Sequence, residues 1–140
     1  MKKILLVLML LTSTQLFAQN EQKISEAFLK SVQEKNFSLL KPWLGENTKA
    51  IQEKWQQVVD NAHRKGFNIR SVTIKRVVNG DIFTKLAQKG IIAVYEYEGK
   101  DWDDMLLMVS TDKEMKLVDI PVTSEMFKLN EKRRGRNTAD

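Results

Sequence analysis

The chain has 140 residues, of which 42% are hydrophobic and 29% charged, with a formal net charge of +5 and no cysteine. Without cysteine it can form no disulfide and carries neither a thiol nucleophile nor a site for lipid attachment through sulfur. Four basic residues lie in the final segment 130–140: Lys132, Arg133, Arg134 and Arg136. The rest is close to neutral, so we interpret the basic end as a solvated terminus and expect no nucleic-acid partner.

The segment 1–18 has the layout of a secretory signal. Lys2 and Lys3 precede an apolar run over 4–11, and the small residue Ala18 stands before a polar stretch. The run is too short to cross a bilayer as a helix. We therefore expect cleavage near Ala18 and a periplasmic or secreted product without a membrane anchor.

The remaining length favours one compact domain. We expect a single α+β domain over 19–129, followed by a basic disordered tail over 130–140. The core alone has to stabilise this domain, because no disulfide can contribute.

The first predicted element is an amphipathic helix over 23–40. Its apolar residues recur at helical spacing: Ile24, Ala27, Phe28 and Val32. Asn36 is expected to interrupt it, leaving a short second turn over 37–40 before Pro42 disfavours helical geometry at Lys41.

A second helix is predicted next, with Asn47 as its N-cap and Gly66 as its stop. The apolar residues again follow helical spacing: Ile51, Trp55, Val58, Val59 and Ala62. Two consecutive helices at the start of the domain follow from these patterns.

After Gly66 the periodicity changes to alternation, which indicates strands. We predict four strands, over 67–78, 91–98, 102–110 and 115–120. Turns are expected at 79–81, 99–101 and 111–114, and Pro121 is expected to stop the last strand. The segment 82–89 is compatible with a short strand or one helical turn.

Alternation assigns residues of the 91–98 strand to two faces of the sheet. One face carries Ile91, Ala93, Tyr95 and Tyr97, and the other carries Ile92, Val94, Glu96 and Glu98. Leu106 and Leu107 are adjacent apolar residues that point to opposite faces of the strand, which predicts that both faces of the sheet are covered. Met126, Phe127 and Leu129 are expected to dock a last turn against the body.

Helices followed by strands favour an α+β fold, with two N-terminal helices packed on a curved antiparallel sheet of about four strands. This order resembles the nuclear transport factor 2-like superfamily, whose cone is also grouped with cystatin-like folds. The residues that carry the resemblance are 27–33, 36–40, 98–102 and 116–120. The resemblance covers nearly the whole mature chain and is one of pattern, closest to small secreted members of unassigned role.

That superfamily includes isomerases, dehydratases, transport adaptors and ligand-binding domains, so the resemblance does not select a function. An enzyme of this kind needs an ionisable base inside the cone, opposed by a hydrogen-bond donor. By alternation, the inward candidates are Asp104, Asp119, Tyr95 and Tyr97. A buried carboxyl beside a tyrosine could abstract a proton next to a carbonyl, whereas the alternative is that these residues only fill or border the sheet.

Two weaker patterns concern metals. His63 follows Asp60 by three residues on one helical face, which permits two ligands but is equally explained by the helix dipole. Asp101, Asp103 and Asp104 resemble the start of a calcium loop but are not followed by its glycine and distal glutamate. We predict no metal site and no cofactor.

Aromatic residues could line a pocket for an apolar ligand. The candidates are Trp43, Trp55, Tyr95, Tyr97 and Trp102. Packing between helix and sheet is the alternative role for them.

Three functions remain open. The leading one is a non-enzymatic extracytoplasmic domain that binds a small apolar ligand or a protein partner. The second is a small isomerase or dehydratase using an Asp/Tyr pair. The third is an envelope interaction protein that acts as a homodimer through its sheet, an arrangement that the family resemblance implies.

Overall fold

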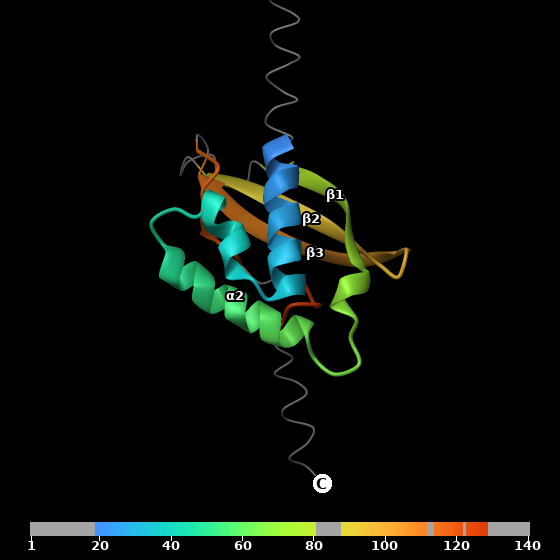
Figure 1. The fold of residues 1–140 in the computed structure, drawn as a ribbon. Helices are drawn as coiled ribbons and strands as arrows, with labels where there is room; N and C mark the ends of the chain where they lie inside the picture. The colour runs from blue at the N-terminus through green and yellow to red at the C-terminus, as the bar shows by residue number, and fades with distance from the viewer. Residues whose placement is uncertain (1–18, 81–87, 112–113, 122, 129–140) are drawn as a thin grey trace, which may run out of the picture.

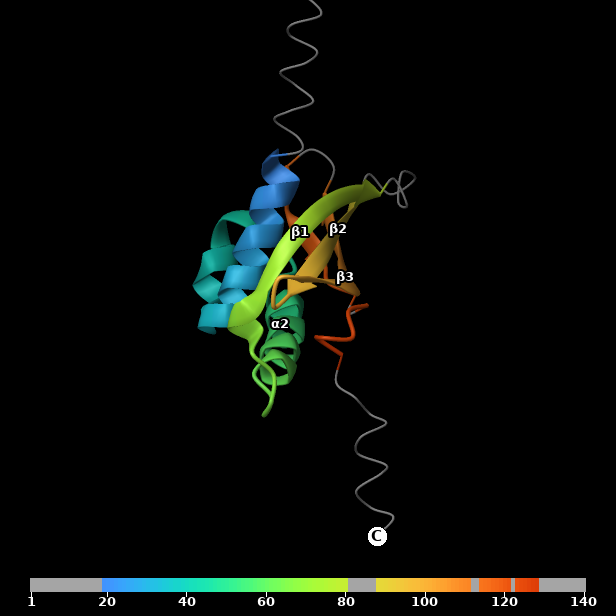
Figure 2. The same ribbon diagram turned by 90° about the vertical axis from the view of Figure 1, so that its right-hand side faces the viewer.

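The computed structural model describes residues 19–80, 88–111, 114–121 and 123–128. It contains a four-stranded antiparallel sheet in the order β1-β2-β3-β4, with the helices gathered on one of its faces (Figures 1 and 2). The predicted α+β class, with helices packed on a curved antiparallel sheet, is therefore confirmed. The predicted signal segment and the whole of the predicted tail lie outside the described residues.

The first helix covers residues 19–34 in the described part of the chain, and it runs vertically in blue in Figure 1. Ile24, Phe28 and Val32 are buried, as their spacing predicted. The helix ends at Lys35, whose φ of 53° is left-handed, and the Asn36 amide donates to the Ser31 carbonyl at 2.8 Å. This closure is typical of a helix C-terminus, although glycine is the usual residue there.

A short 3-10 helix, η1 (Phe37–Trp43), follows, and Asn36 caps it by accepting from the Ser38 amide at 3.1 Å. The predicted interruption at Asn36 is confirmed. Pro42 was expected to lie beyond the turn, but it lies inside η1. The fixed φ of proline is compatible with 3-10 geometry, so the chain can continue through it.

The long helix α2 (Thr48–Ala62) places the five predicted apolar residues on its buried face. Asn47 occupies the N-cap position, but its side chain makes no capping hydrogen bond, contrary to the prediction. Its backbone carbonyl instead accepts from the Ile51 amide at 3.1 Å. Gly66 has a φ of +83° in the turn that follows the helix.

The sheet consists of β1 (Val72–Gly80), β2 (Gln88–Tyr97), β3 (Lys100–Thr111) and β4 (Leu117–Asp119). The number of strands and their antiparallel order agree with the sequence analysis. β1 starts later than predicted because a 3-10 turn, η2 (Ile69–Ser71), precedes it. The segment 82–89 was predicted to form a short strand or one helical turn. Its residues 88 and 89 belong to β2, and the remainder lies outside the described residues.

Two of the predicted turns need correction. The hairpin turn between β2 and β3 consists of Glu98 and Gly99, with φ values of 53° and 73°, and not of residues 99–101. Two consecutive positive φ values are typical of a type I′ turn, which matches the twist of the flanking strands. Asn79 and Gly80 were expected in a turn but still pair with Ile91 and Gly90 of β2.

The two faces of the sheet have different environments. Ile91, Ala93 and Tyr95 face the helices and are fully buried, together with Leu106 and Met108 of β3. The predicted cover on both faces is wrong for the described residues, because the helices lie on one side only (Figure 2). Leu106 is buried beneath them, whereas its neighbour Leu107 points to the other face and is partly exposed.

Residues 123–128, here called the C-terminal strap, close the core. Phe127 lies edge-on to Phe28 and Tyr95, with ring centroids 6.0 and 5.8 Å apart. Met126 is also buried. The predicted docking of Met126 and Phe127 is thus confirmed, and Leu129 lies outside the described residues.

Candidate functional site

Asp104 and Tyr95, two of the proposed catalytic residues, lie together in the interior. Asp104 points inward because it shares the alternation of the buried residues Leu106 and Met108 on β3. Burial and the nearby Asp104 carboxylate both raise the pKa of Tyr95 above its usual value. The Tyr95 hydroxyl is buried without a hydrogen-bond partner. Such a tyrosine stays in its neutral form and is a weaker acid than a solvated tyrosine, so it is a poor proton donor to a substrate.

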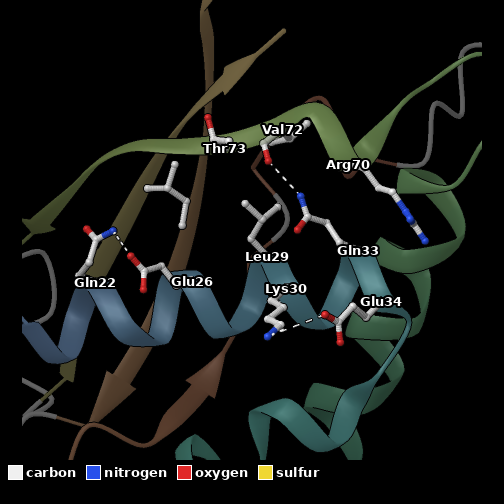
Figure 3. A pocket seen from close by; sticks show the side chains of 10 residues that line it. Gln22, Glu26, Leu29, Lys30, Gln33, Glu34, Arg70, Val72 and Thr73 are labelled. Atoms are coloured by element: carbon white, nitrogen blue, oxygen red, sulfur yellow. Dashed lines mark hydrogen bonds and ion pairs between the residues drawn. The ribbon is translucent and has the colours of Figure 1, made fainter. Parts of the chain in front are cut away.

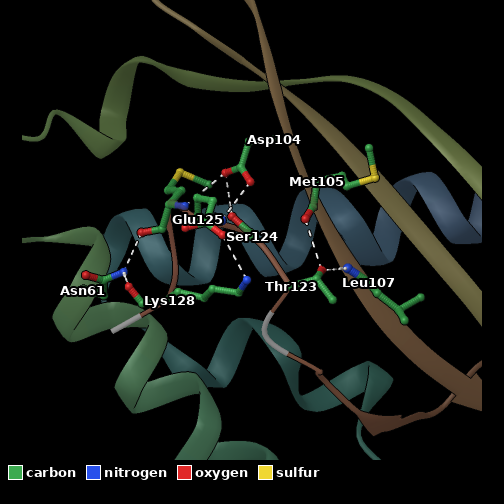
Figure 4. Close-up of polar contacts among 9 residues, drawn as sticks. Asn61, Asp104, Met105, Leu107, Thr123, Ser124, Glu125 and Lys128 are labelled. Atoms are coloured by element: carbon green, nitrogen blue, oxygen red, sulfur yellow. Dashed lines mark hydrogen bonds and ion pairs between the residues drawn. The ribbon is translucent and has the colours of Figure 1, made fainter. Parts of the chain in front are cut away.

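The Asp104 carboxylate is engaged by the C-terminal strap (Figure 4). It accepts hydrogen bonds from the Ser124 hydroxyl at 2.6 Å and from the backbone amides of Glu125 and Met126 at 2.9 and 3.2 Å. These three donors occupy both carboxylate oxygens, so the carboxylate is committed to holding the strap. The geometry gives Asp104 a structural role.

Helix α2 and β3 hold the same strap. The Asn61 side-chain amide donates to the backbone carbonyls of Met126 and Lys128, and Arg64 donates to the Met126 carbonyl at 2.8 Å. On the other side, Thr123 binds the backbone of Met105 and Leu107 at 3.1 and 3.0 Å. Side chains from two elements therefore fix a strap whose own chain forms neither helix nor strand.

The other two catalytic candidates lie elsewhere. Asp119 is on β4, two strands from Tyr95, where it forms an ion pair with Lys54 and accepts from the Ile120 amide at 2.8 Å. Tyr97 stacks on Phe67 at 5.1 Å between ring centroids. The structure brings one Asp/Tyr pair together and leaves Asp119 and Tyr97 outside it.

The aromatic candidates divide among separate clusters. Trp55 is buried against Phe37 and donates its indole N–H to the Ser31 hydroxyl at 2.9 Å. Tyr97 and Trp102 meet beside Phe67, with ring centroids 5.5 Å apart, at the hairpin end of the sheet. Trp43 is partly buried at the end of η1, and Tyr95 packs on the strap. These contacts match the packing interpretation of the aromatic residues.

One nitrogen of the His63 ring is engaged by the backbone of the first helix. Its Nε2 lies 2.7 Å from the Val32 carbonyl oxygen, to which it must donate, because a carbonyl only accepts. Asp60 is hydrogen-bonded to Gln56 at 2.9 Å, and Asp101 forms an ion pair with Lys75. Within the described residues, no three His, Asp or Glu side chains cluster closely enough to hold a metal ion.

A groove of about 530 Å³ separates the first helix from β1 (Figure 3). Leu29 and Val72 contribute its apolar surface, and polar side chains of the helix form much of the rest. Gln33 donates to the carbonyls of Ile69 and Val72, both at 3.0 Å. The sequence does not reveal this groove, because its glutamines and charged residues follow the same pattern as any exposed helical face.

The opposite surface of the sheet is more distinctive. Five apolar residues that are at least partly exposed share this apolar outer face: Val78, Ile92, Val94, Met105 and Leu107. Val109 lies on the same side by register but is buried. Val78 and Met105 are 40% and 48% exposed, and they are the large hydrophobic residues left exposed in the described part of the chain. Both lie on this face, next to partly exposed neighbours. Alternation assigned Ile92 and Val94 to this face. Because a second layer was expected to cover the face, its exposure to solvent was not predicted.

Charged side chains border the apolar outer face at one end. Arg76 stands beside Val94 in the register, Glu96 pairs with Asp101, and Lys75 reaches Asp101 from β1. An apolar centre with a charged border is the composition of many protein–protein interfaces. The face thus has the features of a docking surface, whereas Asp104 and Tyr95 hold the fold together.

Comparison of the chain with family models, with curated proteins and with solved structures gave no match. The resemblance to the nuclear transport factor 2-like superfamily therefore stays a prediction. None of the helices in the described ranges is both long and apolar enough to cross a membrane.

Proposed function

We propose that this chain is a non-enzymatic extracytoplasmic interaction domain that binds a protein partner on its apolar outer face, and that the partner is a second copy of itself. The observation that carries the proposal is the exposure of Val78 and Met105 on a sheet face that no described helix covers. The largest apolar patch on a soluble monomer is typically a few hundred Å² and often has a binding function, so this patch indicates a binding surface.

The contacts inside the domain support this choice over the other two functions. Phe28, Tyr95 and Phe127 pack against each other where an interior ligand would lie. The groove beside β1 combines the apolar side chains of Leu29, Val72 and Ile74 with seven polar or charged residues, which suits an amphipathic ligand better than a purely apolar one. Catalysis by Asp104 would compete with three hydrogen bonds that hold the strap.

The size of the face predicts a weak and reversible dimer. β1 has nine residues, which at about 3.3 Å each gives a length of about 30 Å. Three long strands spaced about 4.8 Å apart add a width of roughly 15 Å. The projected area is therefore roughly 450 Å² per copy, or about 900 Å² for the pair, which is below the range of stable specific interfaces and within that of weak, transient ones. Arg76 and Glu96 supply both signs of charge at the border, as a self-complementary surface requires.

The test is sedimentation velocity of the processed protein over a series of concentrations. The double variant Val78→Lys/Met105→Lys changes the outer face, and Gln52→Lys/Gln57→Lys adds the same charge on exposed positions of α2. We expect the wild type and the α2 control to associate with rising concentration and the outer-face variant to stay monomeric. A wild type that stays monomeric, or an outer-face variant that associates equally well, would refute the proposal.

A further inference from the structure

Met105 differs from the other described methionines in its access to solvent. It is 48% exposed, whereas Met108, Met115 and Met126 are 0%, 3% and 0% exposed. Its backbone carbonyl accepts from Thr123, and it pairs with Val94 within the sheet, so the strand holds it in place. Its thioether is thus presented to solvent at the apolar outer face.

From this position we infer that Met105 is a site of reversible oxidation by peroxides, and that its oxidation state controls docking on the apolar outer face. The inference rests on the proposed function. The thioether sulfur attacks one oxygen of hydrogen peroxide, and a sulfur–oxygen bond forms as the O–O bond breaks. The other oxygen leaves as hydroxide, takes the proton from the oxygen now bound to sulfur, and departs as water. Sulfur is oxidised by two electrons and the peroxide is reduced by two. Methionine sulfoxide can be reduced enzymatically, which makes the change reversible.

The chemical consequence follows from the surroundings of Met105. Its neighbours on this face are Val94 and Leu107, which offer no hydrogen-bond donor from their side chains. A sulfoxide oxygen buried against them in a dimer would lose its water without gaining a partner, and burying an unpaired polar group is costly. We expect oxidation to raise the dissociation constant at least about tenfold. By the same linkage, association should protect Met105 from peroxide.

The experiment treats the processed protein with hydrogen peroxide and locates the added oxygen by peptide fragmentation mass spectrometry. The control is the same oxidised sample after treatment with a methionine sulfoxide reductase and a thiol reductant, which restores the thioether without changing the sequence. Oxidation should occur at Met105 before Met108, Met115 and Met126. Sedimentation should then show dissociation of the oxidised wild type and renewed association of the same sample after enzymatic reduction.

The outcomes separate the two claims. Oxidation at Met105 no faster than at the buried methionines, or an oxidised wild type that associates as before, would overturn the inference and leave the docking proposal intact. An unoxidised wild type that never associates would overturn both. Slower oxidation of Met105 at high protein concentration would support both, because the interface would then shield the sulfur.

Discussion

Replacing Asp104 with asparagine keeps the shape of the side chain but removes its charge and one acceptor oxygen. One side-chain oxygen can still accept from the Glu125 amide, and the Ser124 hydroxyl can rotate to accept from the new amide group. The Met126 amide cannot rotate and loses its acceptor. A buried unsatisfied N–H costs about 1–3 kcal/mol, and weaker neutral hydrogen bonds add about 1 kcal/mol. We expect Asp104→Asn to destabilise the domain by about 2–4 kcal/mol.

The assay is urea unfolding followed by far-UV circular dichroism, with a thermal scan alongside. The expected loss corresponds to a fall in Tm of roughly 8–15 °C for a domain of this size. Asp103→Asn is the matched control, because Asp103 is exposed on the same strand and should change stability by about 0.5 kcal/mol or less. If the two variants were equally stable, Asp104 would not hold the strap and this account of the interior would be wrong.

Two further predictions concern the backbone at Lys35 and the buried hydroxyl of Tyr95. Lys35→Gly relieves a left-handed φ of 53° and should stabilise the domain by about 0.5–1 kcal/mol in urea unfolding; a loss of stability would contradict the helix ending described above. Tyr95→Phe removes a hydroxyl without a partner and should leave stability at neutral pH unchanged or raise it by about 1 kcal/mol. Because burial and Asp104 raise the folded-state pKa of Tyr95 above its unfolded value near 10, the wild type should lose stability as pH rises above about 10. Tyr95→Phe should lose less over the same range, and parallel pH profiles for the two proteins would refute that assignment.

Local periodicity was sufficient to predict the main elements. Ile24, Phe28 and Val32 indicated the buried face of the first helix, and Ile91 and Ala93 indicated the inner face of β2. Buried residues recur with the period of the helix or strand that contains them, so the pattern can be recognised from residues close together in the sequence. The corrections fall where geometry depends on one or two residues, such as the turn at residues 98 and 99.

The role of Asp104 could not be predicted in the same way. Its partners Ser124 and Met126 lie about twenty residues further along the chain, and Asn61 reaches the Met126 carbonyl across a separation of 65 residues. Side-chain contacts to an irregular strap leave no periodic pattern in the sequence. Alternation placed Asp104 inside correctly, but an inward carboxylate can serve catalysis or structure, and its hydrogen-bond partners favour structure.

The exposed sheet face was missed for a related reason. Leu106 and Leu107 both suggested burial, although only Leu106 lies beneath the helices. An apolar residue looks the same in the sequence whether it is covered by a layer of its own chain or by a partner. The arrangement of the helices in Figure 2 distinguishes the two cases.

The central claim is that the apolar outer face binds a second copy of the chain. The most direct measurement places a photoreactive amino acid at position 105 in one sample and at position 52 in another, and maps the cross-links after irradiation. We predict cross-linked dimers from position 105, joined to the outer face of the second copy around Ile92, Val94 and Leu107, and few from position 52. Cross-links from position 105 only within one chain, or only to the helical side of a second copy, would contradict the claim.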